Sequence, residues 1–473
     1  PLRLVGAEMC IRDRYNNLLL SNHYEPKLGR SGMRMFFVIL ICKLLKFIGG
    51  VLGRGSSLPG QIALKLYPNI LSKVKLPEYV IAVTGSNGKT STVEMIAHIL
   101  KAGGKRVAWN KEGSNQIEGV ATLILSSCSL LGKMKEDILL IESDERYARY
   151  TFQYFAPTHY VITNLYRDQL TRNGHPEWVF DALKHSIRDE TQLVLNADDP
   201  LVSLFGYNRE NTVWFGVDRY SGSSDKPTGV YNDGMFCPNC KEKMEYDYCH
   251  FGDLGSYHCT RCGHKKNQTS YTVTQVDLEK GAVTIDGVHK ISISLHSMYN
   301  VYNILAAYAV CSIAGVKSAT IVNSINNYVL QNGRVVNFKI GAHSGVLLAS
   351  KHENSVSYDQ SLKLAAASKG PSAVLVIVDS ISRKYFTSET SWLWDINFDL
   401  LKGDNISSVI LSGKYANDLA ARFSYSEVEN AKLYVVEDIG EAVGYLKDNG
   451  DEYIYVITCF ADKDKLLSKV NII

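Results

Sequence analysis

The feature that most constrains the fold is a glycine-rich turn, GSNGKTS at residues 85–91, between an apolar run and an amphipathic stretch. The apolar run YVIAVT (79–84) predicts a buried strand, and the stretch from Thr90 to Lys101 predicts a helix. Glycines let backbone amides approach a phosphate group, and a helix N-terminus adds partial positive charge. Strand, turn and helix together predict a nucleotide-binding phosphate loop rather than a turn without a ligand.

Each position of this loop has an expected role with ATP. Lys89 is expected to pair with the β and γ phosphates, and the Thr90 hydroxyl to be a ligand of Mg²⁺. The TGxNGKT form is tighter than the common GxxxxGK[ST] loop and resembles the Mur ligase superfamily, whose members join a carboxylate to an amine at the expense of ATP. The predicted nucleotide-contacting residues of the loop are Gly85, Asn87, Gly88, Lys89, Thr90 and Ser91.

A second motif consists of two cysteine pairs. Cys237 and Cys240 are followed after 18 residues by Cys259 and Cys262, which gives CxxC-x18-CxxC. Four thiolates at this spacing predict a closed tetrahedral Zn²⁺ site. Since the thiolates fill all four positions, we expect the zinc to be structural. A redox CxxC pair is the competing interpretation.

Composition adds the cellular setting. Four of the ten cysteines fall in CxxC pairs, which suits a reducing cytosol with a metal site better than a disulfide framework. A net charge of only +3 gives no reason to expect nucleic acid as a partner. Three histidines near the cysteine pairs are expected to be exposed loop residues rather than ligands: His250, His258 and His264.

Apolar runs that alternate with helical patterns predict an α/β fold with a parallel sheet covered by helices. RVAWN, DILLIES, YVITN and QLVLNADD are further strand candidates. In such sheets a ligand lies at the carboxyl ends of the strands. Glu142, Asp144 and Glu145 end one of these strands, and Glu142 is our candidate for Mg²⁺. A solvated strand end is the alternative reading of each carboxylate.

The pattern of residue types changes twice beyond residue 200. A β-rich insertion follows around residues 218–290, and a second α/β region begins after GRVVNF at 333–338. Its strand candidates are VLLAS, AVLVIVD, ISSVILSG, KLYVVED and YIYVITC. We predict an artefactual or disordered leader (1–32), an apolar helix (33–57), a central ATP-binding domain (58–337, zinc ribbon at about 230–268) and a C-terminal α/β domain (338–473).

The apolar stretch near the N-terminus, residues 36–52, could touch a membrane. It is short for a bilayer span and is interrupted by Lys43 and Lys46. We therefore expect a buried or interfacial helix rather than a membrane anchor.

Several further motifs resemble one branch of the Mur ligases, the MurT family of ligase subunits of lipid II isoglutaminyl synthases. They are NLYRDQLTR, LNADDP, FGVD, the Cys₄ insertion, MYNVYNILAA and GRVVNF. Other Mur ligases and folylpolyglutamate synthases resemble only the first half. The resemblance implies that ATP phosphorylates the α-carboxylate of D-glutamate in the lipid II stem peptide and that ammonia then displaces phosphate. It also implies a heterodimer with a GatD-type glutaminase, which would supply the ammonia at the cytoplasmic side of the membrane.

The resemblance also assigns roles to individual residues. Asn300 and Asn303 in YNVYN would line the nucleotide site, and Arg334 in the GR motif would reach the phosphates. Asp168 in RDQ would face Mg²⁺ or the substrate. A surface asparagine on a helix is the alternative for either asparagine.

In the C-terminal half the resemblance is weaker. TSETSWLWDINFDLL (387–401) is similar to a family segment whose acidic residue orients the partner's catalytic histidine. Either Asp395 or Glu389 would do so here, and the sequence does not decide between them. The family's KNPAGF-like stretch is replaced by KHENSVSY at 351–358.

Two other functions fit part of this pattern. An amino-acid-adding ligase would need no partner, and the zinc ribbon and the RDQ motif argue against it. A nucleotide-binding scaffold without activity would tolerate the loss of Lys89, Thr90 and Glu142, all of which are present.

Overall fold

The computed structural model describes most of the chain and divides it into two compact units. Arg334 and the predicted leader as far as residue 27 lie outside the described residues. The described residues are 28–51, 56–111, 113–169, 173–231, 233–293, 296–328, 335–381, 389–449 and 452–473. The first unit comprises Pro1–Val83, Gly104–Tyr160 and His185–Thr191, and the second Thr84–Gly103, Val161–Lys184 and Gln192–Ile473.

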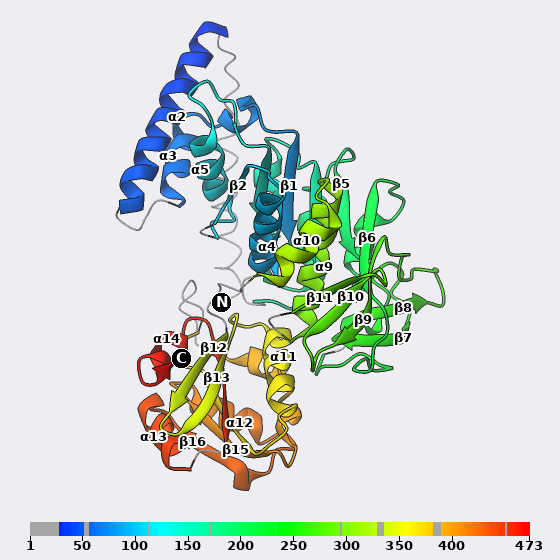
Figure 1. The fold of residues 1–473 in the computed structure, drawn as a ribbon, viewed down its shortest axis with the longest axis vertical. Coiled ribbons are helices and arrows are strands. Elements are labelled where there is room, and N and C mark those ends of the chain that lie inside the picture. The colour runs from blue at the N-terminus through cyan, green and yellow to red at the C-terminus, as the bar shows by residue number, and fades with distance from the viewer. Residues whose placement is uncertain are drawn as a thin grey trace, which may run out of the picture. The chain divides into compact units, whose positions relative to one another are not determined.

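The first unit contains a small parallel sheet and a group of helices. The strand β3 pairs in parallel with β1 on one side and with β2 on the other. The helices α2, α3 and α5 pack against one another, as Figure 1 shows. The bounds are α2 (Leu28–Val51), α3 (Leu58–Leu66), β1 (Tyr79–Thr84), β2 (Val107–Trp109), α5 (Ile117–Ser127), β3 (Ile138–Glu142) and α6 (Ala148–Phe152).

Helix α2 carries apolar side chains on several sides. Its Val38, Ile39 and Cys42 are buried, whereas other apolar side chains of the helix are exposed. The two lysines that interrupt the apolar stretch bind α5: the Nζ of Lys43 donates to the carbonyl oxygen of Ser126, and that of Lys46 donates to its Oγ. Among the described residues, no helix combines the length and apolarity needed to cross a bilayer.

In the second unit, one set of strands continues the α/β pattern after the phosphate loop. The strands β5, β6 and β9 pair in parallel, and β10 and β11 extend them as an antiparallel meander. Helix α9 packs on β5, β6 and β9 and lies beside α4 (Figure 1). The bounds are α4 (Lys89–Ala102), β4 (His159–Ile162), α8 (Pro176–Lys184), β5 (Gln192–Asn196), β6 (Thr212–Val217), β9 (Tyr271–Asp277), β10 (Ala282–Ile285), β11 (His289–Ser292), α9 (Met298–Ile313) and α10 (Ser318–Asn326).

The cysteine pairs flank a two-stranded antiparallel sheet of β7 (Met244–Phe251) and β8 (Leu254–Cys259). The expectation that the nearby histidines are exposed was wrong for His250 and His264, which are buried. His250 lies on β7, and burial lowers the pKa of its imidazole. The β-rich character of this segment was predicted, and only the burial of these two histidines was not.

A seven-stranded sheet forms the C-terminal part of the second unit, in the order β16-β15-β14-β17-β13-β12-β18. Five neighbouring strands from β16 to β13 are parallel, β12 pairs antiparallel with β13, and β18 pairs antiparallel with β12. The bounds are β12 (Val335–Ile340), β13 (His343–Ser350), α11 (Ser355–Ala366), β14 (Ser372–Ile377), β15 (Ile406–Ser412), α12 (Ala416–Phe423), β16 (Leu433–Val436), α13 (Ile439–Asn449), β17 (Tyr453–Cys459), α14 (Lys463–Leu467) and β18 (Asn471–Ile472).

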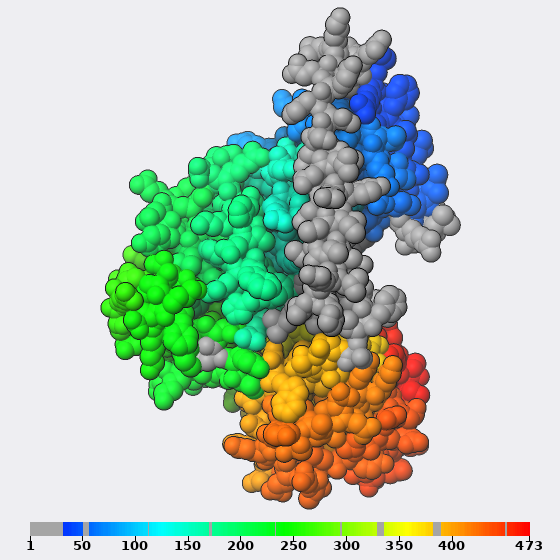
Figure 2. All heavy atoms as spheres, turned by 180° about the vertical axis from the view of Figure 1, so that it is seen from behind, coloured from blue at the N-terminus to red at the C-terminus, as the bar shows by residue number. Residues whose placement is uncertain are grey.

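Both faces of this sheet are covered, which explains the continuous apolar runs of its strands. Along β14, Val374 and Val376 belong to one buried cluster, and Ala373 and Leu375 belong to another on the opposite face. Figure 2 shows the outer surface of this C-terminal part in yellow, orange and red. The predicted α/β fold is confirmed, and all five strand candidates of this half are strands. The predicted domain boundaries stay predictions.

Candidate active site

The phosphate loop has a backbone that requires glycine at two positions. Gly85 has φ +139° and Gly88 has φ +84°, and residues with a Cβ atom rarely adopt a backbone with such positive φ angles. A Cβ atom at Gly85 would overlap Thr163 Oγ1, and one at Gly88 would overlap Asn303 Oδ1. The loop therefore lies tightly against the end of β4 and against Asn303 of α9. The predicted role of Asn303 at the nucleotide stays a prediction.

Lys89 begins α4 and turns back over the loop. Its side chain is buried, and its Nζ donates to the carbonyl oxygen of Gly85 and, at 3.5 Å, to that of Ser86. Thr90 and Ser91 follow in the first helical turn and are partly exposed. An ammonium group, glycine backbone and a helix N-terminus thus converge on one loop, a donor set that fits the phosphates of ATP.

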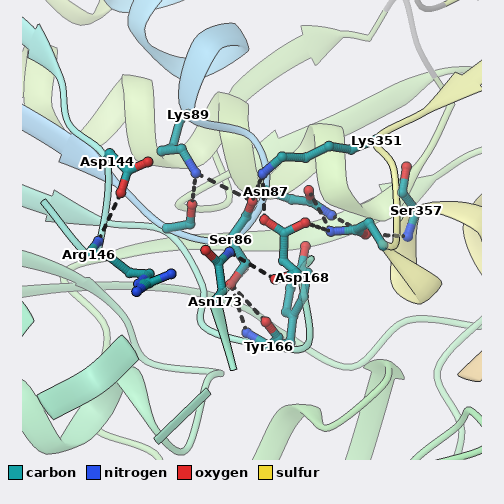
Figure 3. A network of polar contacts seen from close by, with 12 residues as sticks. Ser86, Asn87, Lys89, Asp144, Arg146, Tyr166, Asp168, Asn173, Lys351 and Ser357 are labelled. Atoms are coloured by element: carbon teal, nitrogen blue, oxygen red, sulfur yellow. Dashed lines mark hydrogen bonds and ion pairs between the residues drawn. The ribbon is translucent and has the colours of Figure 1, made fainter. Parts of the chain in front are cut away.

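A polar network ties the loop to the C-terminal part of the second unit. The side chains of Asn87 and Asn354 exchange two hydrogen bonds of 2.8 and 3.1 Å. The Nδ2 of Asn354 also donates to Asp168 Oδ1 at 2.8 Å, and Lys351 Nζ donates to Asp168 Oδ2 at 2.5 Å. Figure 3 shows Lys351 and Asp168 pointing toward each other beside Asn87. Both oxygens of the Asp168 carboxylate thus accept hydrogen bonds, so this residue holds the network together.

Lys351 and Asn354 were missed by the sequence reasoning, which treated 351–358 only as a departure from the family pattern. One signal could have found them. They follow β13 directly, and residues after the carboxyl ends of parallel strands are the expected ligand edge. Asn354 also caps α11 by accepting a hydrogen bond from the Ser357 N–H at 2.9 Å.

The predicted magnesium ligand, Glu142, is the last residue of β3 and is buried. It lies in register with Val83 of β1, two residues before Gly85 in the chain. Asn115 Nδ2 donates to Glu142 Oε1 at 3.2 Å, and Asn110 bonds both the N–H and the carbonyl oxygen of Glu142. The carboxylate is therefore held at the carboxyl end of the strand beside β1.

Helix α9 is fixed by a buried charge. Asp198 Oδ2 accepts a hydrogen bond from the Tyr302 hydroxyl at 2.6 Å, and Asp198 Oδ1 pairs with Lys266 Nζ at 2.8 Å. Tyr302 stands between the two predicted nucleotide-site residues of α9, Asn300 and Asn303, which are both buried. Lys266 follows the second cysteine pair by four residues. This network therefore connects the zinc ribbon to α9, whose Asn303 lies against Gly88.

The four cysteines converge as predicted. Their Sγ atoms all lie within 4.8 Å of one another, with Cys237 and Cys262 3.6 Å apart and Cys240 and Cys259 3.5 Å apart. Tetrahedral Zn–S bonds of about 2.3 Å place the sulfurs about 3.8 Å apart, so the cluster fits one Zn²⁺. The donor set leaves no open position, which fits a structural ion.

The two acidic candidates for the partner contact lie in different surroundings. Glu389 is exposed, and the Ser391 N–H donates to its Oε1 at 2.8 Å, which lowers the pKa of the carboxyl. Asp395 is buried, with its Oδ2 3.8 Å from Arg167 Nη1, and burial raises its pKa. Arg167 is itself held by both oxygens of Asp233.

Comparison with known protein families divides the chain into two matches. The Mur ligase middle domain matches residues 83–226, and the MurT ligase C-terminal domain matches residues 352–462. The first match contains the phosphate loop, Glu142 and Asp168. The second contains Asn354, Glu389 and Asp395.

Whole-length relatives agree with this division. The MurT subunit of the glutamine-hydrolyzing lipid II isoglutaminyl synthase of Staphylococcus aureus (strain COL) is 30% identical over 88% of this chain and 93% of its own length. The same subunit of Streptococcus pneumoniae (strain ATCC BAA-255 / R6) is 28% identical over 88% and 92%. In fold, the chain is similar to a pseudomurein peptide ligase type C from Methanothermus fervidus, with a TM-score of 0.64, 22% identity and coverage of 85% and 80%. The chain therefore belongs to the MurT family and is an ATP-dependent ligase.

Proposed function

We propose that this chain uses ATP to convert the α-carboxylate of D-glutamate in the stem peptide of lipid II into an amide. The observation that carries the proposal is the phosphate loop with its buried Lys89, in a chain whose whole-length relatives are MurT subunits. An amidating ligase needs an ATP site and a second site for nitrogen delivery.

The reaction has two steps whose atoms balance. A carboxylate oxygen attacks the γ-phosphorus of ATP, ADP leaves, and an acyl phosphate forms. The nitrogen lone pair of ammonia attacks the carbonyl carbon, the C–O bond to phosphate breaks, and inorganic phosphate leaves with that electron pair. The nitrogen loses one proton and an amide remains.

The residues at the loop would serve the first step. Lys89 would neutralise charge on the transferred phosphoryl group, since a preorganised cation stabilises charge that develops in the transition state. Thr90 and Glu142 would hold Mg²⁺, which would supply further charge neutralisation. Asn300 and Asn303 would contact the nucleotide.

The hydrogen bonds of Asn354 are expected to support ATP binding at the loop. Replacing Asn354 with serine keeps an N-cap oxygen for α11 but is too short to reach Asn87 and Asp168. Since hydrogen bonds to charged groups contribute about 1.5–3 kcal/mol, we expect the KM for ATP to rise about tenfold or more. Steady-state kinetics with varied ATP measure this, and Ser361→Ala on the same helix is the control. An unchanged KM would mean that the network does not support the loop.

The partner would be a GatD-type glutaminase, because the relatives are named as subunits of a glutamine-hydrolyzing enzyme. Of the two acidic candidates, we assign Glu389 to the partner contact, because its carboxylate is exposed whereas that of Asp395 is buried beside Arg167.

Glu389→Gln tests this assignment. The neutral amide would not stabilise a charged histidine in the partner, so glutamine-driven amide formation should fall at least tenfold while ammonium-driven formation stays unchanged. The matched control is Glu429→Gln, which alters another exposed glutamate. Equal loss with both nitrogen sources would place Glu389 elsewhere in the reaction.

The function itself is tested by incubating the purified chain with lipid II, ATP, Mg²⁺ and ammonium chloride, followed by mass spectrometry of the lipid. Amide formation lowers the mass by about one unit, because OH is replaced by NH₂. Turnover with an amino acid but not with ammonia would instead identify an amino-acid-adding ligase. ATP binding without turnover of any carboxylate would identify a scaffold.

A further inference from the structure

A cavity of 240 Å³ lies in the second unit, and its lining includes neither a residue of the phosphate loop (85–91) nor any of the four cysteines. Part of its wall is one face of α11, where Ser355, Val356, Asp359, Gln360 and Lys363 follow the spacing of a single helix face. The loop after β4, the segment that leads into the first cysteine pair and the 3-10 helices around Asp395 and Leu400 also contribute to the wall. Further lining residues come from the start of α8, from residues 200–201 and from residues 251–253.

The charges around this cavity favour a small cationic guest. Asp233, Asp253, Asp359 and Asp395 line it, whereas its arginine, Arg167, already forms two hydrogen bonds with Asp233. Burial raises the pKa of Asp359 to about 7, because a buried carboxylate lacks the solvation of water.

Burial also disfavours the charged form of Lys363, another cationic side chain of the wall. Burial lowers the pKa of its ammonium group. A site with this surplus of carboxylates disfavours ATP and the glutamate carboxylate. It suits a group that donates N–H bonds and relieves the repulsion among the acids.

Two parts of the wall connect the cavity to the sites described above. Asp395 ends the 3-10 helix Ser391–Asp395, which begins two residues after the exposed Glu389. Tyr166, which follows β4, also lines the cavity, and its backbone N–H donates to Ser86 Oγ in the phosphate loop at 3.1 Å.

A second link runs through α11. Ser355 lines the cavity and directly follows Asn354, whose side chain bonds Asn87 of the loop. The wall is thus built from residues adjacent to the proposed partner contact and residues adjacent to the proposed ATP site.

We propose that this cavity receives the ammonia released by the glutaminase partner and holds it for transfer to the acyl phosphate. The proposal rests on the proposed function. Ammonium bound there would leave one proton on an aspartate, and the resulting neutral ammonia would attack the acyl carbon as described above. The aspartate would then return its proton to solvent, so the charges balance over a cycle.

The test fills the cavity and follows the nitrogen. In the complex with its partner, Val356→Trp would place an indole on the lining face of α11, and Ala367→Trp at the exposed end of the same helix is the control. Glutamate released and amide formed from glutamine are measured together. For Val356→Trp we expect glutamate to exceed amide about tenfold, because the local concentration of ammonia is lost. Excess ammonium chloride should restore amide formation.

Each other outcome has a distinct meaning. Unchanged coupling in Val356→Trp would overturn the proposal. A higher KM for lipid II with both nitrogen sources, without rescue by ammonium, would mean that the cavity binds an amine of the peptide substrate, and would also overturn it. Failure of the unaltered complex with either nitrogen source would contradict the proposed function instead. If Val356→Trp loses its thermal transition, Leu400→Trp fills the same cavity from another element.

Discussion

Replacing Lys89 with methionine is expected to reduce ATP-dependent amide formation by about 10²–10³-fold, because a preorganised charge at the transferred phosphoryl group is lost. The side chain of Lys89 is buried and bonds the carbonyl oxygens of Gly85 and Ser86. Methionine has a similar length and fills the space without the charge. Phosphate release and amide formation measured together with lipid II and ammonium chloride report the effect.

Two controls make this result specific. Lys101→Met removes a lysine from the far end of the same helix, where its side chain is exposed, and should leave the rate unchanged. The Tm of both variants should stay near that of the unaltered chain. A Lys89→Met variant that keeps full activity would remove the phosphate loop from the mechanism.

Loss of the metal from the Cys₄ cluster is expected to weaken ATP binding about tenfold, although the cluster has no open position for a ligand. The cause is the connection through Lys266, Asp198 and Tyr302 to α9, whose Asn303 lies against Gly88. His264 Nε2 adds a second anchor, 2.9 Å from the carbonyl oxygen of Pro200. Since a ribbon of this kind folds around its metal, zinc removal should release both anchors.

Isothermal titration with ATP, after a chelator has removed the zinc, tests this effect. Asp198→Asn then shows whether breaking the contacts of Asp198 with Lys266 and Tyr302 weakens ATP binding while the zinc stays bound. This variant should keep its zinc but leave Lys266 without its buried counter-charge, which costs about 3–5 kcal/mol of stability. Asp225→Asn is the matched control, because Asp225 pairs with Arg219 at the surface and such pairs contribute about 0–1 kcal/mol. Equal ATP affinity with and without zinc would make the ribbon independent of the nucleotide site.

The sequence predicted those parts of the molecule that depend on local pattern. Period and chain order were sufficient for the strands on either side of the loop, and the spacing of Cys237, Cys240, Cys259 and Cys262 was sufficient for the cluster. Glycine is also required at loop positions where a Cβ atom would overlap neighbouring atoms, so the loop could be recognised from its sequence alone.

What the sequence left undecided depends on contacts between distant residues. Asn87 and Asn354 are 267 positions apart, and no local pattern pairs them. The choice between Glu389 and Asp395 needs their burial, which follows from packing beside Arg167 rather than from spacing. His250 and His264 were expected to be exposed loop residues, yet both are buried, and His264 Nε2 lies 2.9 Å from the carbonyl oxygen of Pro200.

Isotope transfer shows whether the carboxylate is activated as an acyl phosphate. Lipid II carrying ¹⁸O in both oxygens of the D-glutamate α-carboxylate is amidated with ATP, Mg²⁺ and ammonium chloride, and the inorganic phosphate is analysed by mass spectrometry. We expect one ¹⁸O in the phosphate for each amide formed, because the oxygen that attacks the γ-phosphorus leaves with it. Phosphate without ¹⁸O, formed at the same rate as the amide, would contradict an acyl phosphate intermediate.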